Sequence, residues 1–141
     1  MRSRSDQRQQ FLSDVLITAI ESGSLGWFVV HEYRYDTVPL GAAYAVIEPE
    51  DDDAETYRVD LDVIARGLAV IRNAAPRPLP GCQDAAPVLC NATTGQRLYL
   101  STDMRRRILA ADRSNGDDGD LDAIDALDIV ECALFGRVVY A

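Results

Sequence analysis

The spacing of apolar residues changes abruptly near Gly23, and this change limits the chain to folds that combine helices with strands. Before Gly23 the apolar residues recur at helical spacing, which predicts a helix that begins at Asp6 or Gln7. After Gly23 the segment LGWFVVHEYRYD is rich in aromatic and β-branched residues and predicts a strand over residues 26–36. A second strand over 42–48 would complete an antiparallel hairpin.

The next part of the chain predicts a short strand, a helix and a loop. Asp60 ends the strand-like segment YRVD and is placed to cap a helix over 61–73. Gly67 inside this helix indicates a close packing contact, since glycine otherwise weakens a helix. Residues 74–97 contain four prolines and two glycines and predict a long loop.

Two more helices are predicted after this loop. Ser101 or Thr102 would cap the first of them, and Asp120 would cap the second, which spans about 121–135 and stops at Gly136. The closing segment RVVYA predicts a final strand, whose exposed edge would allow a homodimer.

Together these elements predict a single α+β domain over residues 1–141. A small antiparallel sheet, built on the hairpin, would pack against about four helices. The Arg- and Ser-rich start, residues 1–6, is expected to be frayed.

Acids greatly outnumber bases in the chain. The sequence has 23 Asp and Glu against 14 arginines, contains no lysine, and carries a net charge of −9. A negative field disfavours attraction to nucleic acid or anionic lipid and favours a protein partner with a basic surface. No apolar run approaches the ~20 residues that cross a bilayer, and the N-terminus lacks the apolar segment of a signal peptide. We therefore expect a cytoplasmic protein that binds neither nucleic acid nor membranes directly.

The residue types that perform chemistry argue against an enzyme. The patterns GxSxG, GxGxxG, HExxH and the P-loop are absent, and His31 is the only histidine. The three cysteines form no CxxC pair, and neither Gly116 nor Gly119 completes a calcium loop of the EF-hand type. We expect no catalytic residue, no metal site and no cofactor.

One segment, DRSNGDDGDLDAIDALDIVECALFG, carries eight carboxylates in front of an apolar run. In one interpretation, its acids stabilise the N-terminus of the last helix, while Asp125 and Asp128 mark the solvent-facing edge of that helix. In the other, the acids imitate nucleic-acid phosphates and occupy the basic surface of a protein that handles DNA or RNA. The residues that would make this contact belong to two acidic clusters: Asp51, Asp52, Asp53, Asp117, Asp118 and Asp120.

An alternative site is predicted around the segment HEYRY. Alternation on a strand places His31, Tyr33 and Tyr35 on one face. Trp27 nearby and a phosphate contact from Arg106 would complete a pocket for a small molecule or nucleotide.

Two separated segments, VLITAIESGSLGWF and DLDAIDALDIVECALFGRVVYA, resemble a group of small uncharacterised proteins from actinobacteria, their phages and their plasmids. The first is similar to a TAxEGGxxYW-like segment, although Ser22 stands where that segment has its first Gly. The second is similar to an LFGxxVYG-like C-terminus, although Glu131 replaces a Gln. The resemblance implies an accessory protein of a phage, plasmid or actinobacterial host. We therefore predict a non-catalytic acidic protein that binds a basic, nucleic-acid-handling partner.

Overall fold

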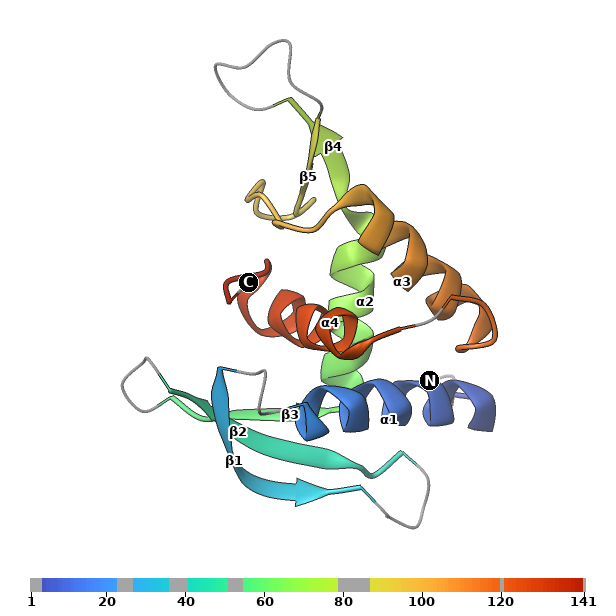
Figure 1. The fold of residues 1–141 in the computed structure, drawn as a ribbon, viewed down its shortest axis with the longest axis vertical. Helices are drawn as coiled ribbons and strands as arrows, with labels where there is room; N and C mark the ends of the chain where they lie inside the picture. The colour runs from blue at the N-terminus through green and yellow to red at the C-terminus, as the bar shows by residue number, and fades with distance from the viewer. Residues whose placement is uncertain are drawn as a thin grey trace.

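In the part of the chain that the structure describes, four helices and two small antiparallel sheets form an α+β fold, which confirms the predicted class (Figure 1). The structure is a computed structural model. It describes residues 4–22, 27–35, 41–50, 55–78, 87–119 and 121–140. In chain order the elements are α1 (Asp6–Glu21), β1 (Phe28–Arg34), β2 (Tyr44–Pro49), β3 (Tyr57–Asp60), α2 (Leu61–Asn73), β4 (Ala75–Arg77), β5 (Val88–Cys90), α3 (Thr102–Ser114) and α4 (Ala123–Phe135).

The larger sheet has the strand order β1-β2-β3, with both pairs antiparallel. Its inner face is apolar because alternate residues of β2 and β3, among them Ala45, Ile47 and Val59, are fully buried. The alternation fails in β1, where the register shifts between Val30 and Glu32 as in a β-bulge.

The helices lie on one side of this sheet. Figure 1 shows α1 between the sheet and α4, while α2 stands upright and crosses α4. The apolar positions predicted for α1 are all buried: Phe11, Leu12, Val15, Leu16, Ala19 and Ile20. The helical spacing in the sequence therefore identified the buried face of this helix correctly.

Helices α2 and α4 approach unusually closely at Gly67. A Cβ atom at this position would lie 2.1 Å from the carbonyl oxygen of Ile129. Only a residue without a side chain allows the two backbones to cross at this distance, so the packing contact predicted from Gly67 is confirmed.

Side-chain caps begin the helices, and one cap differs from the prediction. Asp60 accepts a hydrogen bond from the Val63 N–H and caps α2, as predicted. Helix α4 begins two residues later than predicted, and its N-cap is Asp122, not Asp120. Asp122 is preferred because Asp125 follows it by three residues and completes a capping box, in which each side chain accepts from the other residue's N–H.

Two predictions for irregular regions are wrong. The segment 74–97, predicted as a loop, contains the antiparallel strands β4 and β5. The end of the chain, predicted as a strand, has no strand among residues 137–140. Its backbone donors instead bind a carboxylate and a loop carbonyl, as described below. Within the described ranges, no helix is both long and apolar enough to cross a membrane.

Candidate functional site

Three carboxylates on α4 are buried. The sequence predicted Asp125 and Asp128 at a solvent-facing edge, but Asp125 is fully buried and Asp128 is 6% exposed. The third, Glu131, is 1% exposed. The prediction is wrong because α4 packs against α1 and α2 and is also covered by an arginine of α3.

Asp125 is neutralised by a single arginine from α3. Arg107 donates from Nε and Nη2 to the two carboxylate oxygens, at 3.1 and 2.7 Å. This paired geometry is the strongest form of a charge-assisted hydrogen bond and suits a buried carboxylate. Asp125 therefore links α3 to the start of α4 and is committed to the fold.

Asp128 has a different environment. Among the described residues, none donates a hydrogen bond to it or forms an ion pair with it. Burial, followed by the negative charges of Glu131 and Asp125, raises the pKa of Asp128 to about 7. Part of the Asp128 population is therefore protonated near neutral pH.

Glu131 holds the end of the chain. Its Oε1 atom accepts hydrogen bonds from the backbone N–H groups of Val139 and Tyr140, at 2.9 and 2.6 Å. Burial raises the pKa of Glu131, while these two donors and the nearby Trp27 indole lower it in part. The Glu131 side chain thus binds backbone N–H groups of the C-terminal segment that a neighbouring strand would otherwise bind, and this segment forms no strand.

A groove of about 420 Å³ lies between α1 and the turn that joins α3 to α4. We call it the acidic groove. Its lining residues are Phe11, Asp14, Val15, Thr18, Asn115, Gly116, Asp117, Gly119, Leu121 and Ala126. Asp14 and Asp117 are exposed, whereas Phe11, Val15 and Ala126 are buried. The groove therefore combines carboxylates open to solvent with an apolar floor.

The turn beside the groove is shaped by its own hydrogen bonds. Asn115 ends α3 in the left-handed conformation, with φ of 52°. The Ser114 hydroxyl accepts from the Asp118 N–H at 2.7 Å. Gly119 has φ of +81°, and a Cβ there would lie 2.7 Å from the Arg107 carbonyl oxygen. The turn is therefore folded against α3, and its glycine cannot be replaced without strain.

A buried aspartate on α3 fixes α1 beside this turn. Asp112 forms ion pairs with Arg8 of α1 and Arg72 of α2. Arg8 also donates to the Asn115 side chain at 3.2 Å. The contacts of Arg8 join residues more than 100 positions apart in the sequence, and that of Arg72 joins residues 40 apart, so no local pattern indicates them.

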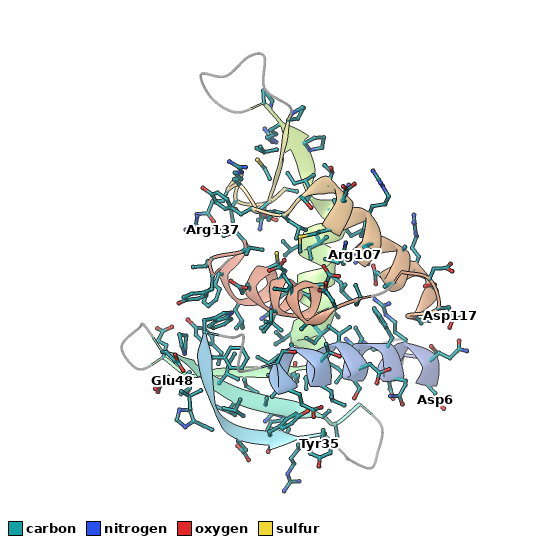
Figure 2. The ribbon with its side chains drawn as sticks, in the orientation of Figure 1. Asp6, Tyr35, Glu48, Arg107, Asp117 and Arg137 are labelled. Atoms are coloured by element: carbon teal, nitrogen blue, oxygen red, sulfur yellow. The ribbon has the colours of Figure 1, made fainter. Side chains whose placement is uncertain are left out.

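Of the six predicted acidic contact residues, the structure describes two. Asp117 and Asp118 lie exposed at the turn beside the groove. Asp51, Asp52, Asp53 and Asp120 lie outside the described residues. Figure 2 shows Glu48, at the end of β2, on the opposite side of the view from Asp117. Asp14 was not predicted, since nothing in its helical position indicates that it faces a turn near residue 117.

The residues of the alternative pocket lie in several environments. Trp27 is buried and stacks on Tyr140, with ring centroids 4.6 Å apart. The Nε2 atom of His31 lies 3.6 Å from Oε1 of Glu48, whereas Tyr33 contacts Tyr35 at 5.1 Å between ring centroids. The bulge in β1 separates His31 from the two tyrosines, so the predicted shared face is wrong.

Two further observations concern the same predicted residues. Burial and the nearby Glu21 carboxylate raise the pKa of Tyr33 to about 12. Arg106 lies exposed on α3 and pairs with Asp103 at 3.3 Å. Four cavities formed by described residues, the acidic groove among them, are not lined by any of the five predicted residues.

Compared with protein-family models, curated proteins and solved structures, the chain matches none of them. Within the described residues, no group of three or more His, Cys, Asp or Glu side chains is arranged to hold a metal ion.

Proposed function

We propose that this chain is a non-catalytic binding protein whose acidic groove accepts a basic segment of a partner protein. The observation that carries this proposal is the position of Asp14 and Asp117 over an apolar floor. An arginine or lysine has the matching shape, because its aliphatic stem packs on apolar surface while its charged end reaches a carboxylate.

The charges around the groove support a cationic ligand. Asp6 and Asp118 are also exposed on α1 and on the turn, so the two elements that form the groove carry further acids. Arg8, the nearest base of α1 to the turn, is already bound to Asp112. With a net charge of −9, the whole chain adds a long-range attraction for basic proteins.

The proposed partner is a basic, nucleic-acid-handling protein of an actinobacterial host, phage or plasmid. Such proteins carry arginine and lysine where they contact phosphates, and carboxylates can occupy the same positions. This choice rests on the sequence resemblance and on the acidity of the groove.

The proposal is tested with a fluorescein-labelled peptide in which arginines alternate with alanines, measured by fluorescence anisotropy. We expect the double variant Asp14→Asn/Asp117→Asn to bind about 10- to 100-fold more weakly, since each charged hydrogen bond contributes roughly 1.5–3 kcal/mol and part of this is screened. Raising the NaCl concentration from 0.05 to 0.5 M should weaken wild-type binding and affect the variant less.

A control variant separates the groove from general acidity. Asp62→Asn/Asp103→Asn makes the same change in charge at two carboxylates that are 79% and 80% exposed and lie outside the groove. We expect it to retain most of the affinity. If both double variants lose the same affinity, the peptide recognises net charge and the groove is not the site.

A further inference from the structure

The chain carries a basic region that its overall acidity conceals. From Val63 to Thr102 the sequence contains four arginines and a single acid, Asp84. Arg66, Arg77 and Arg97 in this region are exposed. The basic region includes the β4–β5 hairpin, which lies at the end of the molecule remote from the larger sheet (Figure 1).

Tyr99, in this region, has an unfavourable backbone conformation and an exposed aromatic ring. Its φ is 61°, in the left-handed region that large side chains rarely adopt, and the residue is 54% exposed. Its neighbours Leu98 and Leu100 are buried, so the chain turns Tyr99 outward between two anchors. Strain of this kind costs roughly 1 kcal/mol or more and is concentrated at sites that bind ligands.

Two arginines lie beside the ring. The Arg97 guanidinium carbon is 4.7 Å from the Tyr99 ring centroid. Arg137, Val138 and Val139 line a cavity of about 250 Å³ together with Tyr99. We call this the Tyr99 cavity.

Neither of these arginines pairs with a carboxylate among the residues that the structure describes. Six other arginines form ion pairs: Arg4, Arg8, Arg58, Arg72, Arg106 and Arg107. Arg97 and Arg137 form none with the carboxylates in the described part of the chain. In a protein with 23 acids, two arginines near Tyr99 that have no carboxylate partner among the described residues are available for an anion from outside.

The two walls of the cavity are held in place by hydrogen bonds. The Val138 N–H donates to the Leu98 carbonyl at 2.9 Å, which joins the C-terminal segment to the Tyr99 segment. Glu131 binds the next two N–H groups, as described above. Asn91, which is buried, donates to the Gly136 carbonyl at 2.9 Å and accepts from the Thr93 N–H. A buried carboxylate and a buried amide thus position a half-buried arginine and an exposed ring.

We propose that the Tyr99 cavity binds a small ligand that joins a flat ring to a phosphate, as in a mononucleotide. The exposed Tyr99 ring provides a surface on which a base stacks, and Arg137 in the cavity wall meets the phosphate, while Arg97 beside the ring adds positive charge. The cavity volume suits one such unit. A long nucleic acid is disfavoured because a chain of net charge −9 repels a polyanion, whereas a single phosphate interacts mainly with the nearest charges.

The test is isothermal titration calorimetry of the full chain with AMP as the probe. Adenosine and ribose 5-phosphate each lack one half of the proposed ligand, and both should bind at least 10-fold more weakly than AMP. A ten-residue oligothymidylate distinguishes a polymer from a free nucleotide. Tighter binding of the oligomer than of AMP, or equal binding of ribose 5-phosphate and AMP, would overturn the assignment.

Variants locate the site. Tyr99→Asn retains a residue that tolerates positive φ, and Arg137→Gln removes one charge; each should reduce AMP affinity at least 10-fold. The matched controls are Tyr35→Asn, at a tyrosine that is 56% exposed and directly follows β1, and Arg66→Gln, at an exposed arginine outside the cavity. Unchanged melting temperatures establish that the variants fold. Equal losses in variants and controls would contradict the proposal.

Discussion

At the scale of single residues, the three buried carboxylates of α4 have three different roles. Asp125 is paired with Arg107, and Glu131 binds two backbone N–H groups. Asp128 has neither kind of partner among the described residues, and its pKa rises to about 7. A carboxylate on this helix therefore pairs with an arginine, holds the end of the chain or destabilises the fold, according to the donors that surround it.

The raised pKa of Asp128 predicts how the stability of the protein depends on pH. The unfolded chain releases this proton near pH 4, whereas the folded chain keeps it until about pH 7. Between these values the folded state binds more protons, so the free energy of unfolding falls as pH rises. Asp128→Asn, which stays neutral, should therefore be more stable than the wild type at pH 8, by at most about 4 kcal/mol, and similar to it at pH 4.

Urea denaturation at pH 4, 6 and 8 measures this difference. The control is Asp118→Asn, which makes the same change of charge at an exposed position. Its stability should follow the wild-type pH dependence. Parallel curves for Asp128→Asn and the wild type would show that the Asp128 carboxyl titrates at its ordinary pKa.

At the scale of elements, the crossing of α2 and α4 determines how close the helices lie. Helix propensity and packing make opposite predictions for Gly67→Ala. In an exposed helix this change stabilises by about 1 kcal/mol, because alanine restricts the unfolded chain. Here the new Cβ would lie 2.1 Å from the Ile129 carbonyl oxygen. This oxygen belongs to the backbone of α4, so it can move away only if the helix itself moves.

We therefore expect Gly67→Ala to destabilise the protein, by roughly 1–3 kcal/mol as for other overpacked sites. Thermal denaturation followed by circular dichroism measures the loss. Gly95→Ala is the comparison, since its Cβ would meet no atom within 4 Å and only its φ of +75° is unfavourable. If Gly67→Ala raises the melting temperature, α2 and α4 are not in backbone contact.

At the scale of the whole molecule, the chain separates its charges. The acidic groove and the Tyr99 cavity lie on opposite sides, as the labelled residues Asp117 and Arg137 show in Figure 2. They share no lining residue. The net charge of −9 is a sum over the whole chain and therefore does not describe the local charge around either site.

This separation predicts that the two proposed sites act independently. Asp14→Asn/Asp117→Asn should leave AMP affinity within about twofold, and Arg137→Gln should leave arginine-peptide affinity within the same range, because distant sites are additive. Calorimetry with each ligand in the presence of the other measures any coupling. A cross-effect larger than about fivefold would mean that the two ligands compete or that a shared rearrangement links the sites.

The candidate sites could be predicted only in part. The acidity of Asp117 and Asp118 is evident in the sequence, and so is their place in a turn. That Asp14 faces this turn depends on Asp112, which holds Arg8 of α1 and Arg72 of α2. Tyr99 gives no signal in the sequence either, because its φ depends on the two leucines that are buried on either side of it.

The sequence by itself determined the α+β class, the order of the helices, the buried face of α1 and the cap at Asp60. These features depend on interactions between residues at most four positions apart, which a sequence displays directly. Only the tertiary structure decided that Asp125, Asp128 and Glu131 are buried. It also decided that Glu131, and not a neighbouring strand, binds the backbone N–H groups near the end of the chain. A carboxylate remains in the interior only where a donor or a helix from a distant part of the chain covers it. The local sequence around the carboxylate does not indicate such a contact.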